Sequence, residues 1–182
     1  MATKTHSTAV VLIPPEEVWE PIQQIRRQHD KQVQRWMPHV TLLYPFRPRE
    51  EFDAVGAALA EACRAVEPFE VELAELRWFP QGRDSFTLWL APKPAQKLAE
   101  LEDALWRVVP DCDDVRRFVK GFTPHLSVGQ VLSRRALNAL VASLQADWQP
   151  LRFVARQAAM IWRNEPPDDV FRVGRTLPLG RS

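Results

Sequence analysis

Pro38-His39-Val40-Thr41-Leu42 and Pro124-His125-Leu126-Ser127-Val128 are two copies of one sequence pattern, and one copy lies in each half of the chain. In both copies a proline precedes a histidine, and a hydroxyl residue follows the histidine after one apolar residue. A strand directs alternate side chains to the same face, so the histidine and the hydroxyl group point one way while the apolar residues point into a core. The repeated pattern therefore predicts two related strands that bring two imidazole groups to one cleft.

The composition indicates a globular protein of one domain, or of two small lobes that share a core. Of the 182 residues, 46% are hydrophobic and 26% are charged, which is ordinary for such proteins. The net charge is only +1, which argues against a broad electrostatic surface for long nucleic acid. A small nucleotide or the end of an RNA chain remains compatible with this charge.

The sequence favours a protein without a metal centre, a disulfide framework or a membrane segment. Cys63 and Cys112 lack metal-ligand spacing, and we expect both to be small buried residues. No apolar run approaches the roughly 20 residues that span a bilayer, and residues 1–7 are too polar for a signal-peptide core. We therefore expect a cytoplasmic monomer without a cofactor or a membrane contact.

Periodic hydrophobic patterns predict a mixed succession of strands and helices. Strands are predicted over residues 7–13, 39–46, 69–79, 85–90, 122–132, 151–163 and 170–177, and helices over residues 16–30, 50–66, 95–109 and 134–145. A turn at residues 81–84 makes a hairpin of two strands, and Ser133 is expected to cap the last helix. A helix and a hairpin follow each motif strand, which predicts a duplicated α+β fold rather than a doubly wound parallel sheet.

Paired histidines suit acid–base chemistry at phosphorus. His39 and His125 are the candidate proton-transfer groups, because an imidazole titrates at pH ~6.5, close to working pH. One imidazole must be neutral and the other protonated, so a bell-shaped pH–rate profile is expected. Thr41 and Ser127 are the candidate donors to the phosphoryl oxygens as charge develops on them. A cyclic phosphate is a favourable substrate for a site that has no metal to activate water.

The motif pair resembles the 2H phosphoesterase superfamily, which is named for two His-x-Thr/Ser motifs and includes RNA 2′,3′-cyclic phosphodiesterases, also called 2′-5′ RNA ligase-like proteins. Phe79-Pro80, Leu88-Trp89-Leu90 and Phe122-x-Pro124-His125 resemble this superfamily as well, so the resemblance covers nearly the whole chain. It implies a single bilobal α+β domain over residues 1–182, in which two antiparallel sheets line a central cleft and the helices lie outside. It also implies metal-independent catalysis by the two histidines.

Five further residues are candidates for substrate binding: Tyr44, Phe46, Phe79, Arg83 and Gln130. The RNA-processing branch of the superfamily usually has arginine where this chain has Gln130, so a neutral amide replaces a charged contact. Phe79 precedes the turn that carries Arg83, so its ring could stack on a base and the guanidinium could reach a phosphate. A core position for Phe79 and a solvated Arg83 are the alternatives.

The two aromatic residues after the first motif are less easily placed. In an unbroken strand Tyr44 shares the core-facing parity of Val40, which favours a core position over a substrate contact. Phe46 has the same parity, but the intervening Pro45 makes that parity unreliable. Arg116, Arg117 and Lys120 precede the second motif and could steer an anionic substrate, although a solvated surface is the commoner role of such a run.

Three functions are compatible with these residues. The leading hypothesis is a phosphodiesterase that opens cyclic nucleotide phosphates, above all the 2′,3′-cyclic end of RNA. The second is a module that binds nucleotides or RNA ends with little turnover, which Gln130 in place of arginine favours. The third keeps the chemistry and changes the substrate to ADP-ribose 1″,2″-cyclic phosphate or a 2′-5′-linked oligonucleotide, with ligation as a side activity.

Overall fold

Alternating and continuous apolar runs form two four-stranded sheets, both antiparallel throughout, in a computed structural model that describes residues 3–181. The first sheet has the order β2-β1-β7-β8, and its strands are β1 (Thr8–Leu12), β2 (Val40–Leu43), β7 (Gln157–Trp162) and β8 (Arg172–Pro178). The second has the order β5-β4-β3-β6, and its strands are β3 (Phe69–Pro80), β4 (Ser85–Lys93), β5 (Leu126–Leu132) and β6 (Leu151–Ala155). The predicted α+β class is confirmed.

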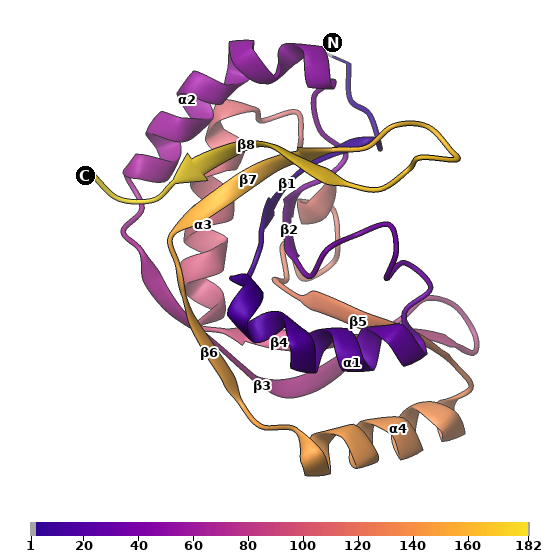
Figure 1. The fold of residues 1–182 in the computed structure, drawn as a ribbon. Coiled ribbons are helices and arrows are strands. Elements are labelled where there is room, and N and C mark those ends of the chain that lie inside the picture. Colours follow the sequence, from indigo (N-terminus) through magenta and orange to yellow (C-terminus); the bar gives the residue numbers. More distant parts are fainter. Residues whose placement is uncertain (1–2, 182) are drawn as a thin grey trace.

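The two sheets do not correspond to the two halves of the sequence. The first sheet pairs the N-terminal strands with the C-terminal strands, and the middle of the chain forms the second sheet (Figure 1). The long strand predicted over residues 151–163 is therefore wrong. It divides at Arg156 into β6, which pairs with β3, and β7, which pairs with β1 in the other sheet.

Within residues 3–181, four helices form close to the predicted positions, and short 3-10 turns precede two of them. They are α1 (Trp19–His29), α2 (Phe52–Arg64), α3 (Ala95–Val108) and α4 (Arg134–Asp147), and the turns are η1 (Glu16–Val18), η2 (Arg49–Glu51) and, before the second motif, η3 (Asp114–Arg116). Ser133 caps α4 as predicted, because its side chain accepts a hydrogen bond of 3.3 Å from the Ala136 N–H. No helix of the described residues 3–181 is long and apolar enough to cross a bilayer.

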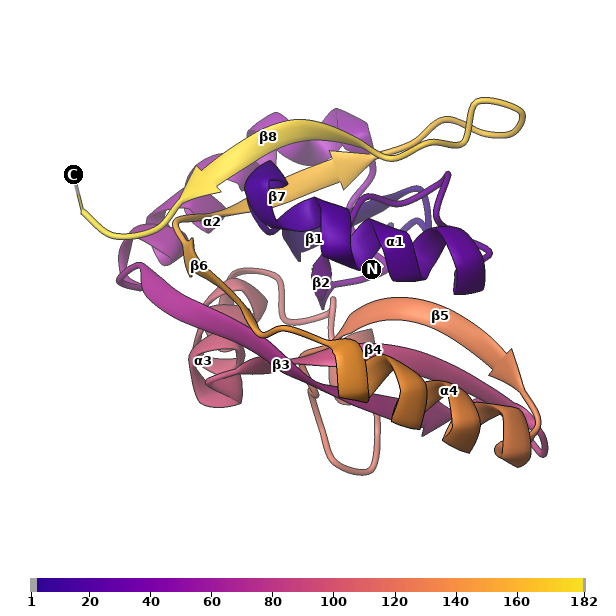
Figure 2. The ribbon, with the colours of Figure 1, turned by 60° about the horizontal axis from the view of Figure 1, so that its bottom comes forward.

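The helix that follows β1 in sequence packs on the second sheet. Helix α1 packs on β5, and Figure 2 shows it on the side of the second sheet that faces the first. The approach is close because β5 has Gly129 there: a Cβ at this position would lie 2.7 Å from Cβ of His29. In the same way α3, which follows the second sheet's β4, contacts β2 of the first sheet. Helix α1, which precedes the motif strand of the first sheet, thus covers part of the second sheet. Helix α3, which precedes the motif strand of the second sheet, likewise covers part of the first sheet.

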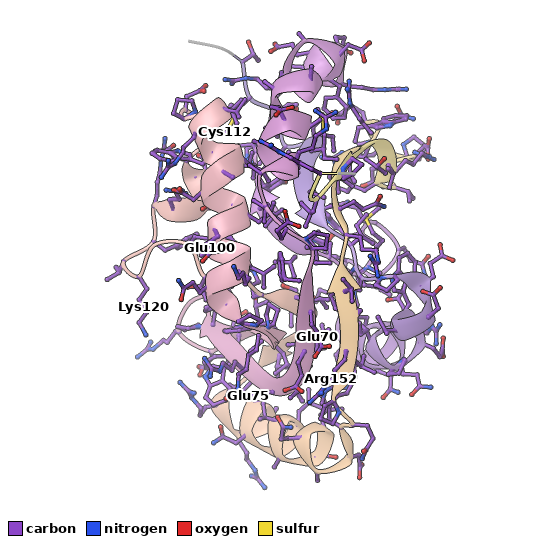
Figure 3. All side chains as sticks on the ribbon, turned by 90° about the vertical axis from the view of Figure 1, so that its left-hand side faces the viewer. Glu70, Glu75, Glu100, Cys112, Lys120 and Arg152 are labelled. Atoms are coloured by element: carbon purple, nitrogen blue, oxygen red, sulfur yellow. The ribbon has the colours of Figure 1, made fainter. Side chains whose placement is uncertain are left out.

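A continuous apolar core joins the sheets and helices, and a smaller apolar cluster lies on the other face of the first sheet. Along β1, Val10 and Leu12 belong to the main core, whereas Ala9 and Val11 belong to the smaller cluster. On the outer side, β3 and β6 carry charged side chains instead, and Figure 3 shows Glu70 and Arg152 side by side there. Both motif strands are edge strands, and β2 contacts β5. This arrangement brings the two motifs together.

Candidate active site

His39 and His125 each lie directly before an edge strand and are fixed by the same contact. Nδ1 of His39 lies 2.7 Å from the carbonyl oxygen of Met37, and Nδ1 of His125 lies 2.8 Å from that of Thr123. In both cases the carbonyl belongs to the residue two positions earlier. Because a carbonyl only accepts, Nδ1 must donate, and this leaves Nε2 of each ring free to exchange a proton with a ligand.

The two hydroxyl residues of the motifs are available to a ligand. Thr41 on β2 and Ser127 on β5 are both half-buried. Within residues 3–181, neither hydroxyl makes a hydrogen bond with another group of the protein. Each can therefore donate to an oxygen that enters between the strands.

A β-bulge follows the hydroxyl residue in both motifs. In β2, Thr41 pairs with Val11 and Leu43 with Val10, so Leu42 is the extra residue. In β5, Ser127 pairs with Trp89 and Gly129 with Leu88, so the extra residue again follows the hydroxyl. A bulge shifts the alternation of side chains by one position. The duplication therefore extends to an irregularity that neither motif reveals in its sequence.

The bulge places Tyr44 on the side of the catalytic candidates. The unbroken parity of the strand predicted a core position, but Tyr44 instead lines a cavity of about 530 Å³ together with Thr41 and His125. Phe79 and Thr123 also line this cavity. The cavity thus brings together one candidate residue of each motif and Phe79 of β3, whereas His39 and Ser127 are not among the residues that line it.

The remaining wall of the cavity is largely apolar and comes from the segment before the second motif. Val115, Phe118, Val119 and Phe122 line it, and Phe118 keeps 71% of its surface exposed. Lys120 belongs to the same wall, on a loop beside α3 (Figure 3). Val115, Phe118 and Val119 were missed in the sequence, although two adjacent apolar residues inside a basic stretch are an available signal.

Each imidazole is packed against aromatic rings, but in different orientations. The ring of His39 is stacked on Trp36, with centroids 4.6 Å apart and an interplanar angle of 18°. His125 instead meets Phe79 edge-on, at 5.0 Å and 88°, and meets Trp89 at 5.9 Å and 64°. Nε1 of Trp89 is buried without a hydrogen-bond partner among the described residues. The rings orient the histidines and shield them from water.

Burial favours the neutral form of both imidazoles. It lowers the pKa of His39 to about 4, and the positive charges of Arg26 and His125 act in the same direction. The Met37 carbonyl and Asp30 oppose this lowering of the pKa of His39. Burial also lowers the pKa of His125, against the opposing effect of the Thr123 carbonyl. The charge of His125 thus contributes to lowering the pKa of His39, which indicates that the two imidazoles interact electrostatically.

Three of the five residues predicted to bind substrate do not reach the cavity. Phe46 is fully buried in the main core, because β2 ends at Leu43 and Phe46 forms a separate backbone bridge with Thr5. Arg83 is exposed in the turn between β3 and β4 and does not line the cavity. Gln130 binds the end of α1, where its amide donates to Asp30 and accepts from the Lys31 N–H.

Two charged groups that act on His39 of the first motif were missed in the sequence. Arg26 and Asp30 form a buried ion pair with Nε and Oδ2 2.8 Å apart and side chains only 2% and 3% exposed. The available signal was position, because Arg26 lies on the apolar stripe of α1 with Ile22 and Ile25. No group of three or more His, Cys, Asp or Glu residues within 3–181 is arranged to hold a metal ion.

Comparisons with known proteins identify the family and the fold. The sequence profile described as the 2′-5′ RNA ligase superfamily matches residues 14–167. No curated protein matches the chain. The fold is similar to TT0787 of Thermus thermophilus, with 20% identity, 96% of this chain and 99% of that chain covered and a TM-score of 0.66.

Two further solved structures contain nucleotides. LigT of E. coli, complexed with 3′-AMP, is 14% identical over 98% of this chain and 100% of that chain, with a TM-score of 0.63. Usb1 of Kluyveromyces marxianus, with uridine monophosphate, is 13% identical over 96% and 99%, with a TM-score of 0.53. At these identities the likeness concerns the fold.

Proposed function

The chain belongs to the 2′-5′ RNA ligase superfamily of 2H phosphoesterases, and from that premise we propose that it hydrolyses cyclic nucleotide phosphates, above all the 2′,3′-cyclic end of RNA. One observation carries the proposal. His39 and His125 are anchored through Nδ1 in the same way, which leaves both Nε2 atoms free beside hydroxyl groups that have no other partner. A site with two such imidazoles has a base and an acid for one displacement at phosphorus.

In the proposed reaction, one neutral imidazole takes a proton from water through Nε2. The water oxygen forms a bond to phosphorus while the bond from phosphorus to the 2′ or 3′ oxygen breaks. The second imidazole, protonated at Nε2, gives its proton to that leaving oxygen. Thr41 and Ser127 donate hydrogen bonds to the non-bridging oxygens as negative charge develops on them.

Binding of the substrate favours the protonated imidazole that the reaction needs as its acid. Burial lowers the pKa of both histidines, so the free site is mostly neutral near pH 7. A bound phosphodiester carries a negative charge between the rings, which raises the pKa of an adjacent imidazole. Binding of the cyclic phosphate is therefore accompanied by uptake of a proton.

The cavity suits a nucleotide at a chain end better than a long polyanion. Its apolar wall, with Phe79, Phe118 and Phe122, offers surface for a base, and Lys120 offers one cation. LigT and Usb1, which share the fold, have been crystallised with 3′-AMP and uridine monophosphate. The two buried free cysteines, Cys63 and Cys112, fit the reducing cytoplasm in which we place this activity.

The test is hydrolysis of 2′,3′-cyclic AMP in EDTA, followed by phosphorus NMR. We expect turnover by the wild type and a loss of about 10³-fold in kcat for His39→Ala and for His125→Ala. His29→Ala, outside both motifs and not among the residues that line the cavity, is the control for removal of an imidazole. Retained activity in both motif variants would refute the assignment.

A panel of substrates separates the remaining alternatives. It contains ADP-ribose 1″,2″-cyclic phosphate, a 2′-5′-linked dinucleotide and an RNA oligonucleotide with a 2′,3′-cyclic end. A preference for ADP-ribose 1″,2″-cyclic phosphate would keep the chemistry and change the substrate. Binding of 3′-AMP without turnover of any member would favour a nucleotide-binding module instead.

A further inference from the structure

The strand of the second motif is connected to the loop of the first motif by one glutamine. Gln130 lies on β5, three positions after Ser127, and its side-chain amide reaches the C-terminal end of α1. Its Oε1 accepts from the Lys31 N–H at 2.9 Å, and its Nε2 donates to Oδ1 of Asp30 at 3.0 Å. Both ends of the amide are therefore used inside the protein.

Asp30 extends this connection to Arg26. Oδ1 of Asp30 also accepts from the Gln32 N–H at 2.9 Å, and Oδ2 accepts from Nε of Arg26 at 2.8 Å. Nη1 of Arg26 donates to Oε1 of Gln23 at 3.1 Å. The desolvation cost of a buried ion pair is offset by further hydrogen bonds to its members, and here each of the three guanidinium nitrogens of Arg26 donates one bond.

The connection ends at the aromatic ring that supports His39. Nη2 of Arg26 donates to the carbonyl oxygen of Trp36 at 2.8 Å. The indole of Trp36 is stacked on His39 on one side and on Phe171 on the other, with centroids 4.6 and 3.7 Å apart. A displacement of Arg26 would move the Trp36 backbone, and with it the ring against which His39 rests.

We propose that Gln130, Asp30 and Arg26 form a positioning unit that holds His39 relative to the second motif strand, and that Gln130 does not contact the substrate. This inference rests on the proposed function, because it concerns the geometry of the same two histidines. Gln130 occupies the position at which arginine is usual in the RNA-processing branch. Its side chain serves the protein's own ion pair rather than a phosphate.

The positioning unit also accounts for two of the charges that act on His39. Besides burial and the Met37 carbonyl, three charged groups influence the pKa of this histidine: Arg26 and His125 lower it, and Asp30 raises it. Gln130 touches Asp30, so a charge introduced at position 130 acts on His39 from the side of the ion pair. His125 has no such charged neighbour among the causes that shift its pKa.

The kinetic test compares Gln130→Leu and Gln130→Arg with Gln145→Leu. Gln145 is a matched control, because its amide also makes two internal bonds, to the Leu76 N–H at 2.9 Å and the Ala74 carbonyl at 3.0 Å, between α4 and β3. We expect about a tenfold loss of kcat with KM within about twofold for both Gln130 variants, because a catalytic group is displaced. We expect wild-type kcat for Gln145→Leu.

Three outcomes of this test would overturn the inference. If Gln130→Leu raises KM severalfold with kcat retained, the amide contacts the substrate. If Gln130→Arg lowers KM without loss of kcat, a cation at this position serves the phosphate and not the ion pair. Wild-type kinetics in both variants would equally remove the positioning role.

A second measurement does not depend on activity, so its failure is distinguishable from failure of the proposed function. In an NMR titration of the histidine Cε1–H signals, Gln130→Glu places a second carboxylate beside Asp30. We expect the pKa of His39 to rise by about 0.5 and that of His125 to stay at its wild-type value. An unchanged His39, or equal rises in both histidines, would contradict the inference.

Discussion

His39 and His125 have the same backbone setting and different surroundings. Both donate from Nδ1 to the carbonyl two residues earlier, both precede an edge strand, and both strands have a bulge after the hydroxyl residue. His39, however, lies face to face with Trp36 near the Arg26–Asp30 pair, whereas His125 lies edge-on to Phe79 and Trp89. The duplicated backbone thus fixes which nitrogen is free, and the surrounding side chains are what differ.

The difference teaches that symmetry in the backbone does not make the two histidines interchangeable. Opposite Thr41 the neighbouring strand has Val11, whereas opposite Ser127 it has Trp89. The charges of Arg26 and Asp30 act on His39 only. The same substitution can therefore be made in each motif and the two results compared. Equal effects are expected for properties that depend on the duplicated backbone, and unequal effects for properties that depend on the surrounding side chains.

The largest expected effect concerns stability against pH. An unfolded histidine titrates near 6.5, while burial lowers the pKa of folded His39 to about 4. Between these values the unfolded state binds more protons, so stability is full above about pH 6.5 and is lost as the pH falls towards 4, by roughly 3 kcal/mol for this group. Urea unfolding at several pH values measures this loss.

The same experiment compares the two sides. His39→Gln should flatten the dependence of the free energy of unfolding on pH over this window, and His125→Gln should flatten it in the same direction, since burial also lowers the pKa of His125. A variant that leaves the slope unchanged would show that its histidine is not desolvated in the folded protein.

The next effect concerns the hydroxyl groups. Thr41→Val and Ser127→Ala each remove one donor to the developing charge, which is expected to cost about 10²-fold in kcat for a cyclic phosphate. Equal losses follow if the phosphate lies symmetrically between the motifs. A difference of more than about tenfold would place the phosphorus nearer to one motif, and no loss in either would remove the hydroxyls from the mechanism.

A smaller effect is expected in the pH profiles of catalysis. The profile of kcat/KM reports the free protein, in which burial lowers the pKa of both histidines, so its optimum should lie below pH 6.5. The profile of kcat reports the complex, in which the bound anion raises the pKa of the imidazoles. Its optimum should lie at higher pH by about one unit. Coincident optima would show that the substrate does not lie between the rings.

The sequence predicted the elements that local pattern determines. The helices, the hairpin of β3 and β4, the Ser133 cap and the pairing of two motifs on strands all follow from periodicity, turn residues or repetition. The single strand predicted over residues 151–163 is the exception, because it divides in two: the structure buries alternate residues in β6 and consecutive residues in β7, a change of burial pattern. That change marks the passage from one sheet to the other.

Long-range pairing determined what the sequence could not show. The bulges depend on how β2 and β5 meet their partner strands, and they reversed the expected position of Tyr44. The role of Gln130 depends on α1 crossing to the second sheet, which its own neighbours in sequence do not indicate. The resemblance to the 2H phosphoesterases identified position 130 as one to consider, but only the folded structure shows that the amide of Gln130 binds Asp30.

The smallest expected effect on stability concerns Trp89. Its indole lies opposite Ser127 of the second motif, whereas the corresponding position opposite Thr41 of the first motif is Val11. Trp89 is buried with no partner for its Nε1–H among the described residues, so Trp89→Phe removes a donor without breaking a hydrogen bond. Trp148→Phe is the matched control, because Nε1 of Trp148 donates to the Leu73 carbonyl at 2.8 Å. We expect Trp148→Phe to lower the free energy of unfolding by about 1 kcal/mol more than Trp89→Phe. If Trp89→Phe costs as much as the control, the indole has an acceptor in the folded protein; the nearest cross-strand candidate is Ser127, which would then be occupied rather than free for phosphate.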